Sequence, residues 1–303
     1  MGTQTTPVTN THQRFARKST TILKWSKKLS RTEVFPIKKD FSKRTFCSVC
    51  IGLNIQGCNP SLKSKSSWKL PRIREYIYEL QEENYFVPFV ALVETWLSSH
   101  VENAQVNIDG FNTYRQDRKR TQHGGVLLYI NKKIVIDCFE SYNDEQCCAV
   151  ICLSRLSKCF FCCVYRPPGA TLTSFCSLLS FISDYVSLQN PLDKFRLHIF
   201  GDFNLPGFCW ENRHLANSSH NALYSHFSQF LNTHHLSEYV KQNTRKNNML
   251  DLFLSNDSNF VQFINCDEIY ISDHLLVKIH TCSFEALGPT TEIENKCSSD
   301  FNF

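Results

Sequence analysis

Short apolar runs of strand length recur along this chain in two series, and longer segments with a helical period lie between them. The runs that we expect to be strands cover residues 46–55, 87–93, 111–114, 125–130, 134–138, 147–153, 159–165, 195–200, 250–254 and 275–280. A single sheet with this many strands would need both of its faces covered. The two series therefore predict an α/β fold in which two packed sheets are flanked by helices.

Three amphipathic segments are predicted to be the covering helices. Residues 71–84 carry Ile73, Ile77 and Leu80 at helical spacing, and residues 172–188 and 221–232 show the same period. Apolar side chains that recur every three or four residues line one face of a helix. Each segment can therefore pack one face on a sheet and leave the other in water.

The charge of the chain is unevenly distributed. The net charge is +5, yet residues 1–46 alone contain eleven Lys or Arg and two acidic residues. We expect residues 1–45 to be a basic, disordered tail, residues 46–282 to form the folded domain, and residues 283–303 to be a polar C-terminal tail. A solvated extension is the plainest interpretation of the basic tail; attraction to nucleic-acid phosphates and a transport signal are the functional alternatives.

The sequence predicts neither a membrane segment nor a disulfide framework. No apolar run reaches the length of about 18 residues that a membrane-spanning helix needs, and the N-terminus lacks the apolar part of a signal peptide. The 15 cysteines are an odd number, and many lie inside apolar runs, which suits reduced thiols in a core. We expect an intracellular protein with no membrane contact and no disulfide-linked partner. The spacings Cys47/Cys50 and Cys159/Cys162 lie in strand-like runs, which disfavours a zinc site.

Two of the predicted strands end in polar side chains suited to chemistry. Residues 87–93 lead directly into Glu94, and residues 195–200 lead into Gly201-Asp202-Phe203-Asn204. If the strand continues, alternation puts Asp202 and Asn204 on one side. There the carboxylate can accept a proton from water and the carboxamide can donate a hydrogen bond to a phosphate oxygen. An Asx turn is an equally good interpretation of this segment alone.

A polar triplet, Ser272-Asp273-His274, precedes the strand predicted at residues 275–280. An aspartate beside a histidine could orient the imidazole to bind a phosphoryl oxygen. Because a polar turn before a strand is common, the triplet by itself is weak evidence.

The case is stronger when these segments are taken together with others along the chain. The further segments are Leu53-Asn54-Ile55, Leu92-Val93-Glu94-Thr95-Trp96, Gly124-Gly125-Val126, Tyr165-Arg166-Pro167-Pro168, Thr244-Arg245-Lys246-Asn247-Asn248-Met249-Leu250-Asp251 and Leu250-Asp251-Leu252-Phe253-Leu254. In this order and spacing, over residues 46–280, they resemble the endonuclease/exonuclease/phosphatase family. The resemblance is strongest to the endonuclease domain of LINE-type (non-LTR) retrotransposons.

The resemblance implies a DNase I-like fold, which is a four-layer α/β sandwich of two mixed β-sheets flanked by helices. Its active site would lie at the strand ends of both sheets. Glu94 would be the principal Mg²⁺ ligand and Asn54 its neighbour, with Mn²⁺ as the alternative ion. Mg²⁺ takes oxygen ligands and keeps several waters, so a site with one or two carboxylates suits it.

The catalytic roles are implied by the same resemblance. Asp202 would orient or deprotonate the attacking water, and Asn204 would hold the phosphate. His274 would contact the scissile phosphate, while Asp273 would fix the His274 ring.

Three further residues would support this centre. Tyr165 would lie at the phosphate, Thr244 would help to bind the substrate, and Asp251 would belong to the network around the metal and His274. One departure is Gln56, since DNA-repair relatives have an acidic residue two positions after the asparagine. That difference argues against an abasic-site preference and against a second metal ion.

The implied activity is Mg²⁺-dependent hydrolysis of a phosphodiester, by which one strand of DNA is nicked, in a protein that we expect to be nuclear. Alternatives are the same fold acting on a phospholipid or an RNA, and a catalytically silent nucleic-acid-binding remnant. The basic residues Arg115, Arg118, Lys119 and Arg120 could contact phosphates or could be a solvated cluster. Since no reverse-transcriptase segment follows, we expect a detached endonuclease module, a domesticated gene or a fragment of a longer element.

Overall fold

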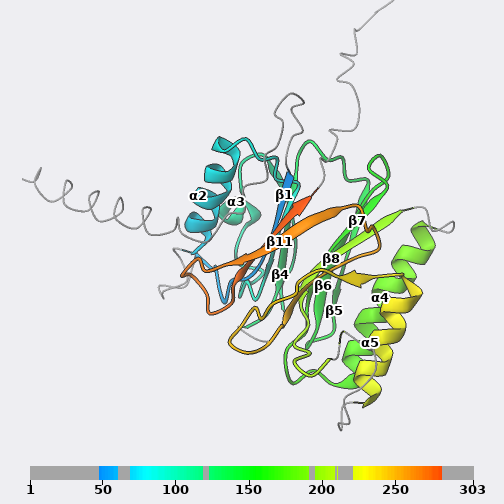
Figure 1. Ribbon diagram of the computed structural model, residues 1–303. Coiled ribbons are helices and arrows are strands. Elements are labelled where there is room, and N and C mark those ends of the chain that lie inside the picture. Colours follow the sequence, from blue (N-terminus) through cyan, green and yellow to red (C-terminus); the bar gives the residue numbers. More distant parts are fainter. Residues whose placement is uncertain are drawn as a thin grey trace, which may run out of the picture. The chain divides into compact units, whose positions relative to one another are not determined.

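The computed structural model describes residues 48–60, 69–118, 123–190, 195–208, 210 and 221–281. These residues form two six-stranded sheets with helices beside them (Figure 1). The predicted tails, residues 1–45 and 283–303, lie outside the described residues. No helix in the described part of the chain is long and apolar enough to cross a membrane.

The first sheet has the strand order β11-β12-β1-β2-β4-β3. Its strands are β1 (Ser48–Asn54), β2 (Phe89–Val93), β3 (Phe111–Gln116), β4 (Val126–Asn131), β11 (Val261–Asp267) and β12 (Leu276–Thr281). The sheet is mixed, because β1 and β2 are parallel whereas β12 and β4 run antiparallel to them.

The second sheet has the strand order β5-β6-β7-β8-β10-β9. Its strands are β5 (Cys138–Asn143), β6 (Cys148–Ser154), β7 (Cys159–Tyr165), β8 (Arg196–Asp202), β9 (Ser237–Glu238) and β10 (Asp251–Ser255). Here β7 and β8 are the parallel pair, and β6 and β10 run antiparallel to them.

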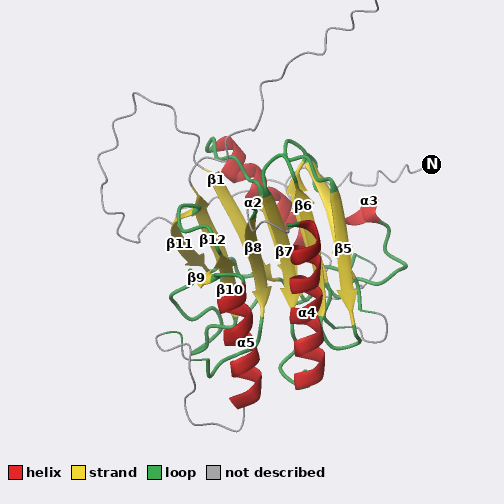
Figure 2. Cartoon of the chain, turned by 90° about the vertical axis from the view of Figure 1, so that its right-hand side faces the viewer, coloured by secondary structure: helices red, strands yellow, loops and turns green. Residues whose placement is uncertain are grey.

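Helices cover the outer face of each sheet. They are α2 (Lys69–Glu82), α3 (Asn103–Val106), α4 (Leu172–Gln189) and α5 (Asn221–Thr233). The buried face of α2 packs with one side of the first sheet, and α4 and α5 pack with one side of the second sheet (Figures 1 and 2). The predicted four-layer sandwich is confirmed.

Strand alternation builds a third apolar layer between the two sheets. In β7, Phe160 and Cys162 face the helices, whereas Cys159, Phe161 and Cys163 face the other sheet. Successive side chains of a strand point to opposite faces, so runs that are apolar at every position fit strands buried on both sides. Cys159 and Cys162 therefore lie in different layers and cannot bind one metal ion together. All cysteines in the described residues are free thiols.

The topology brings many strand ends to one edge of the sandwich. The parallel strands β1 and β2 end there in one sheet, and β7 and β8 end there in the other. The antiparallel strands β4, β10 and β12 begin at the same edge. Polar side chains that follow or precede these buried strands can therefore meet.

A glycine lets the two sheets approach closely just beneath this edge. A Cβ atom placed on Gly52 of β1 would lie 2.1 Å from the ring of Phe200 in β8. Only a residue without a side chain leaves room for that ring. Two residues further along, both strands end, at Asn54 and Asp202. The contact of Gly52 with Phe200 thus brings those two strand ends within reach of each other.

One predicted strand is misplaced, and two strands and a short helix were not predicted. The strand expected at residues 134–138 is β5 (Cys138–Asn143), an edge strand that is half-buried or exposed at every position. Its polar outer face gives little apolar signal, while the apolar run before it forms a turn in which Val135 is 55% exposed. An apolar signal is also missing for three other elements. Strand β9 has two residues and helix α3 has four, which is too short for a periodic pattern, and β11 is half-buried or exposed at every position.

Candidate active site

Asp202 ends β8 and is buried at the edge between the two sheets. Its Oδ1 accepts a hydrogen bond from the backbone N–H of Asn204 at 3.1 Å, and its Oδ2 accepts one from Asn54 Nδ2 at 2.8 Å. The first bond is that of an Asx turn. The expected strand alternation is therefore wrong, because Asn204 has a φ of 49° and lies beyond the end of the strand. Its side-chain amide donates to the Arg166 carbonyl at 2.8 Å.

Glu94 follows β2 in a left-handed backbone conformation, with a φ of 53°. The chain around it is fixed by hydrogen bonds from Gly57 N to the Glu94 carbonyl at 2.7 Å and from Trp96 N to the Gly124 carbonyl at 2.9 Å. Non-glycine residues hold this conformation only where their surroundings enforce it, and such positions cluster at functional sites. The turn aims the Glu94 carboxylate at the end of β1.

Both carboxylate oxygens of Glu94 are held by donors. Asn54 Nδ2 lies 3.3 Å from Oε1, and Trp96 Nε1 donates to Oε2 at 3.1 Å. Since Asn54 Nδ2 also donates to Asp202, one amide joins the carboxylates of the two sheets. In this orientation the Asn54 amide nitrogen positions the two acids and its Oδ1 accepts the backbone N–H of Gln56 at 3.2 Å; its role as a metal ligand stays a prediction.

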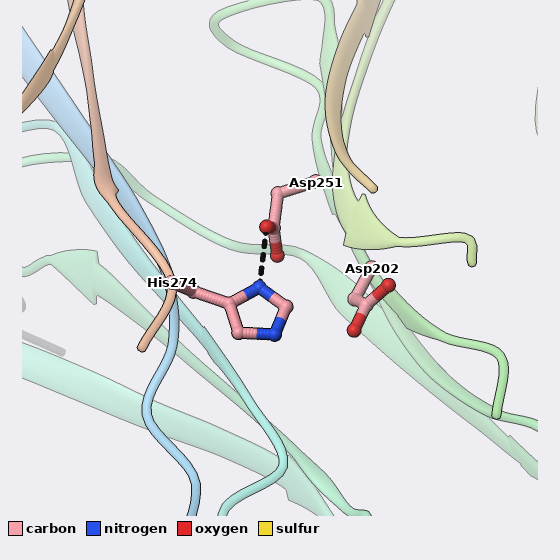
Figure 3. A group of neighbouring side chains, drawn as sticks. All are labelled: Asp202, Asp251 and His274. Carbon is pink, nitrogen blue, oxygen red and sulfur yellow. Dashed lines mark hydrogen bonds and ion pairs between the residues drawn. The ribbon is translucent and has the colours of Figure 1, made fainter. Parts of the chain in front are cut away.

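His274 precedes β12 and forms a buried pair with Asp251, the first residue of β10 (Figure 3). Its Nδ1 lies 2.6 Å from Asp251 Oδ2, and both side chains are fully buried. The expectation that Asp273 fixes the ring is therefore wrong; Asp251 fixes it. Because Nδ1 is engaged, Nε2 is the nitrogen turned toward Asp202.

Asp273 is held by other partners. Arg245 donates to its Oδ2 from Nε at 3.0 Å and from a terminal nitrogen at 2.8 Å, and the Gln56 amide donates to its Oδ1. Burial alone would raise the pKa of Asp273, but its hydrogen bonds and the charge of Arg245 bring that pKa below its usual value. Asp273 Oδ1 remains 3.9 Å from His274 Nε2.

Thr244 and Tyr165 have different places in this arrangement. The Thr244 side chain is fully buried, and its hydroxyl oxygen accepts the backbone N–H groups of Leu250 and Asp251 at 3.1 and 3.0 Å. It positions the start of β10 and has no surface for a substrate, contrary to our expectation. Tyr165, at the end of β7, is 4% exposed, and burial next to Glu94 and Asp202 raises the pKa of its hydroxyl far above the usual range. Tyr165 therefore carries a proton that it can donate.

Negative charge accumulates at this edge. Burial, followed by the charge of Asp251, raises the pKa of Asp202 well above its usual value. For His274, burial alone would lower the pKa, but the hydrogen bond and charge of Asp251, with the charge of Asp202, raise it. A buried carboxylate whose proton affinity is raised suits a group that takes a proton from water.

The same residues fit a hard divalent cation. Among the described residues, Asp202, Asp251 and His274 each offer a ligand atom within 4.8 Å of the others. The buried atoms Asp251 Oδ1 and His274 Nε2 have no hydrogen-bond partner in the described part of the chain. Glu94 adds a third carboxylate, linked to Asp202 through Asn54. Oxygen-rich donor sets of this kind suit Mg²⁺ or Mn²⁺.

Comparison with known proteins gives the family context of this site. Residues 159–278 match the family model described as endonuclease-reverse transcriptase. The chain is similar to the 3'-5' exonuclease of Neisseria meningitidis, at 15% identity and a TM-score of 0.56, over 78% of this chain and 100% of that one. An AP endonuclease from Archaeoglobus fulgidus matches at 11% identity and 0.56, with coverage of 78% and 100%. An endonuclease/exonuclease/phosphatase family protein from Bacteroides thetaiotaomicron matches at 11% and 0.53, with coverage of 79% and 96%.

These structural likenesses show a shared fold. No curated protein matches the sequence. Together with the family model, the solved structures confirm the resemblance to the endonuclease/exonuclease/phosphatase family and its DNase I-like fold. The matched segment contains Tyr165, Asp202, Asp251 and His274, whereas Asn54 and Glu94 lie before it and join the site through the fold.

Proposed function

We propose that this chain, which has the endonuclease/exonuclease/phosphatase fold, is a Mg²⁺-dependent phosphodiesterase that nicks DNA. The observation that carries the proposal is the meeting of Glu94, Asp202 and the Asp251–His274 pair at one edge of two sheets. The family model that matches residues 159–278 is described as endonuclease-reverse transcriptase, which supports the proposal that the nuclease derives from a retrotransposon. The basic composition of residues 1–46 suits a nucleic-acid substrate and a nuclear location.

In the mechanism that we propose, water attacks phosphorus in line with the departing sugar oxygen. Asp202 accepts a proton from that water, since burial beside Asp251 raises the pKa of its carboxyl. Asn54 keeps the Asp202 carboxylate in place, through the 2.8 Å hydrogen bond to Oδ2. The Asx turn at Asn204 N fixes the other oxygen at 3.1 Å.

His274 and Tyr165 stabilise the charge that develops on the phosphate. With Nδ1 held by Asp251 at 2.6 Å, the protonated ring presents Nε2–H to a phosphate oxygen. Tyr165 keeps its proton because burial raises the pKa of the hydroxyl, and it can donate a further hydrogen bond. Glu94, with Asp202 and Asp251 nearby, would hold a Mg²⁺ ion, which would supply positive charge for the phosphate and leaving oxygens. This chemistry needs no covalent enzyme intermediate.

A substrate panel tests the proposal. The full chain is incubated with supercoiled plasmid, poly(A) RNA and phosphoinositide vesicles, each with Mg²⁺ and with excess EDTA. We expect open-circular plasmid to form in Mg²⁺ only, and much slower turnover of the other two substrates. Plasmid nicking that persists in EDTA would contradict the metal requirement, and faster hydrolysis of RNA or lipid would replace DNA as the substrate.

A further inference from the structure

Arg118, which the sequence leaves open as a phosphate contact or a solvated charge, lies beside the proposed active site. It follows β3, and its side chain packs over Gly124, which precedes β4 and has a φ of 92°. A Cβ atom on Gly124 would lie 2.2 Å from Arg118 Cδ and 3.1 Å from Tyr165 Cε1. The glycine therefore leaves the space in which Arg118 and Tyr165 meet.

Within the described residues, backbone carbonyls and not an acidic partner hold the charge of Arg118. Its guanidinium donates to the His123 carbonyl at 3.3 Å and to the Glu145 carbonyl. No carboxylate of the described residues forms an ion pair with it, and its buried Nε has no hydrogen-bond partner among them. By contrast, Arg115 in the same segment pairs with Asp117 at 3.1 Å and is largely buried. In the described part of the basic cluster, Arg115 is thus paired and turned inward, whereas Arg118 lies against Gly124 next to Tyr165.

Tyr165 separates Arg118 from the carboxylates. The tyrosine is buried next to Glu94 and Asp202, while the edge of its ring borders the space over Gly124 that Arg118 occupies. A phosphate at the carboxylate cluster would therefore not be the one that Arg118 meets. Arg118 would instead meet a neighbouring phosphate of the same strand, because a polynucleotide carries one phosphate charge per nucleotide.

We propose that Arg118 binds a backbone phosphate next to the one that is hydrolysed, and so favours a polynucleotide over an isolated phosphodiester. The inference rests on the proposed function. A guanidinium fixed by backbone carbonyls is oriented in advance for the oxygens of a phosphate. The two basic residues that follow, Lys119 and Arg120, lie outside the described residues.

The test compares Arg118→Gln with Arg72→Gln, which removes the same charge from the exposed face of α2, where Arg72 pairs with Glu75 at 2.7 Å. Anisotropy of a labelled duplex is measured in EDTA at several NaCl concentrations. Losing one phosphate contact should lower the slope of log K against log salt by about 0.9 in Arg118→Gln. Arg72→Gln should keep the wild-type slope, and Arg118→Lys should keep most of it.

Turnover gives the second readout. The ratio of kcat/KM for plasmid DNA to that for bis(p-nitrophenyl) phosphate should fall about tenfold in Arg118→Gln, through KM for DNA. A slope and ratio equal to those of Arg72→Gln would overturn the role of Arg118, as would an equal loss on both substrates. If the wild-type chain nicks no DNA, the proposed function fails, and the salt slope still decides whether Arg118 contacts a phosphate.

Discussion

Replacing Asp251 by asparagine should slow the reaction strongly while the fold stays intact. The Asp251 carboxylate and the His274 ring meet at 2.6 Å, and both side chains are fully buried. Asparagine has nearly the same shape and can still accept a hydrogen bond from Nδ1, but it carries no charge. With the charges about 4 Å apart and an effective dielectric constant of about 20, the attraction removed from a protonated ring is about 4 kcal/mol.

The rate should fall because the charged ring is the form that stabilises the phosphate in our mechanism. About 4 kcal/mol corresponds to a roughly thousandfold decrease in kcat. Plasmid nicking at saturating Mg²⁺ measures the decrease, and thermal unfolding followed by circular dichroism checks the fold. Asp273→Asn is the matched control and should lose far less, because the Asp273 side chain is 45% exposed and its charge is already paired with Arg245 at 2.8 Å. A decrease below tenfold in Asp251→Asn, or an equal one in Asp273→Asn, would refute the reasoning.

Three further substitutions test the positioning of Glu94, the buried His198 and the contact between the two sheets. Trp96→Phe removes the donor to Glu94 Oε2, so Mg²⁺ affinity by calorimetry should fall about tenfold; unchanged affinity would show that Trp96 does not position Glu94. Burial lowers the pKa of His198 to about 3, so between pH 7 and pH 5 this histidine takes up a proton only in the unfolded chain, and the free energy of unfolding falls by about 2 kcal/mol. His198→Phe should abolish this part of the fall, as measured by urea unfolding at the two pH values. An equal fall in both proteins would contradict the prediction. Gly52→Ala forces a Cβ against the Phe200 ring and should cost about 1–3 kcal/mol of unfolding free energy; wild-type stability would show that the sheets can separate freely.

Much of the fold and the location of the site could be predicted from local patterns. The buried strands are apolar at every position, as in β7, and the helical faces repeat with a clear period. Glu94 and Asp202 stood out because each interrupts an apolar run at a strand end. Such signals depend only on neighbouring residues. The edge strand β5 was misplaced because its positions are half-buried or exposed and give little apolar signal.

Pairings across the chain could not be predicted in the same way. His274 is adjacent in sequence to Asp273, yet its partner is Asp251, 23 positions earlier. The Asp273 side chain is instead drawn toward Arg245 and Gln56. Thr244 likewise looked like a substrate contact, but its hydroxyl serves two backbone N–H groups. Which polar groups pair is decided by strand register and turn geometry, and the motif alone contains neither.

The central claim is that the strand-end carboxylate Asp202 accepts a proton from the attacking water during DNA hydrolysis. The most direct measurement is the Mg²⁺-dependent rate at which the full chain nicks supercoiled plasmid, compared between wild type and Asp202→Asn. Losing a general base of this kind should slow nicking at least about a hundredfold, while circular dichroism shows the same fold. Equal nicking rates in the two proteins would contradict the claim.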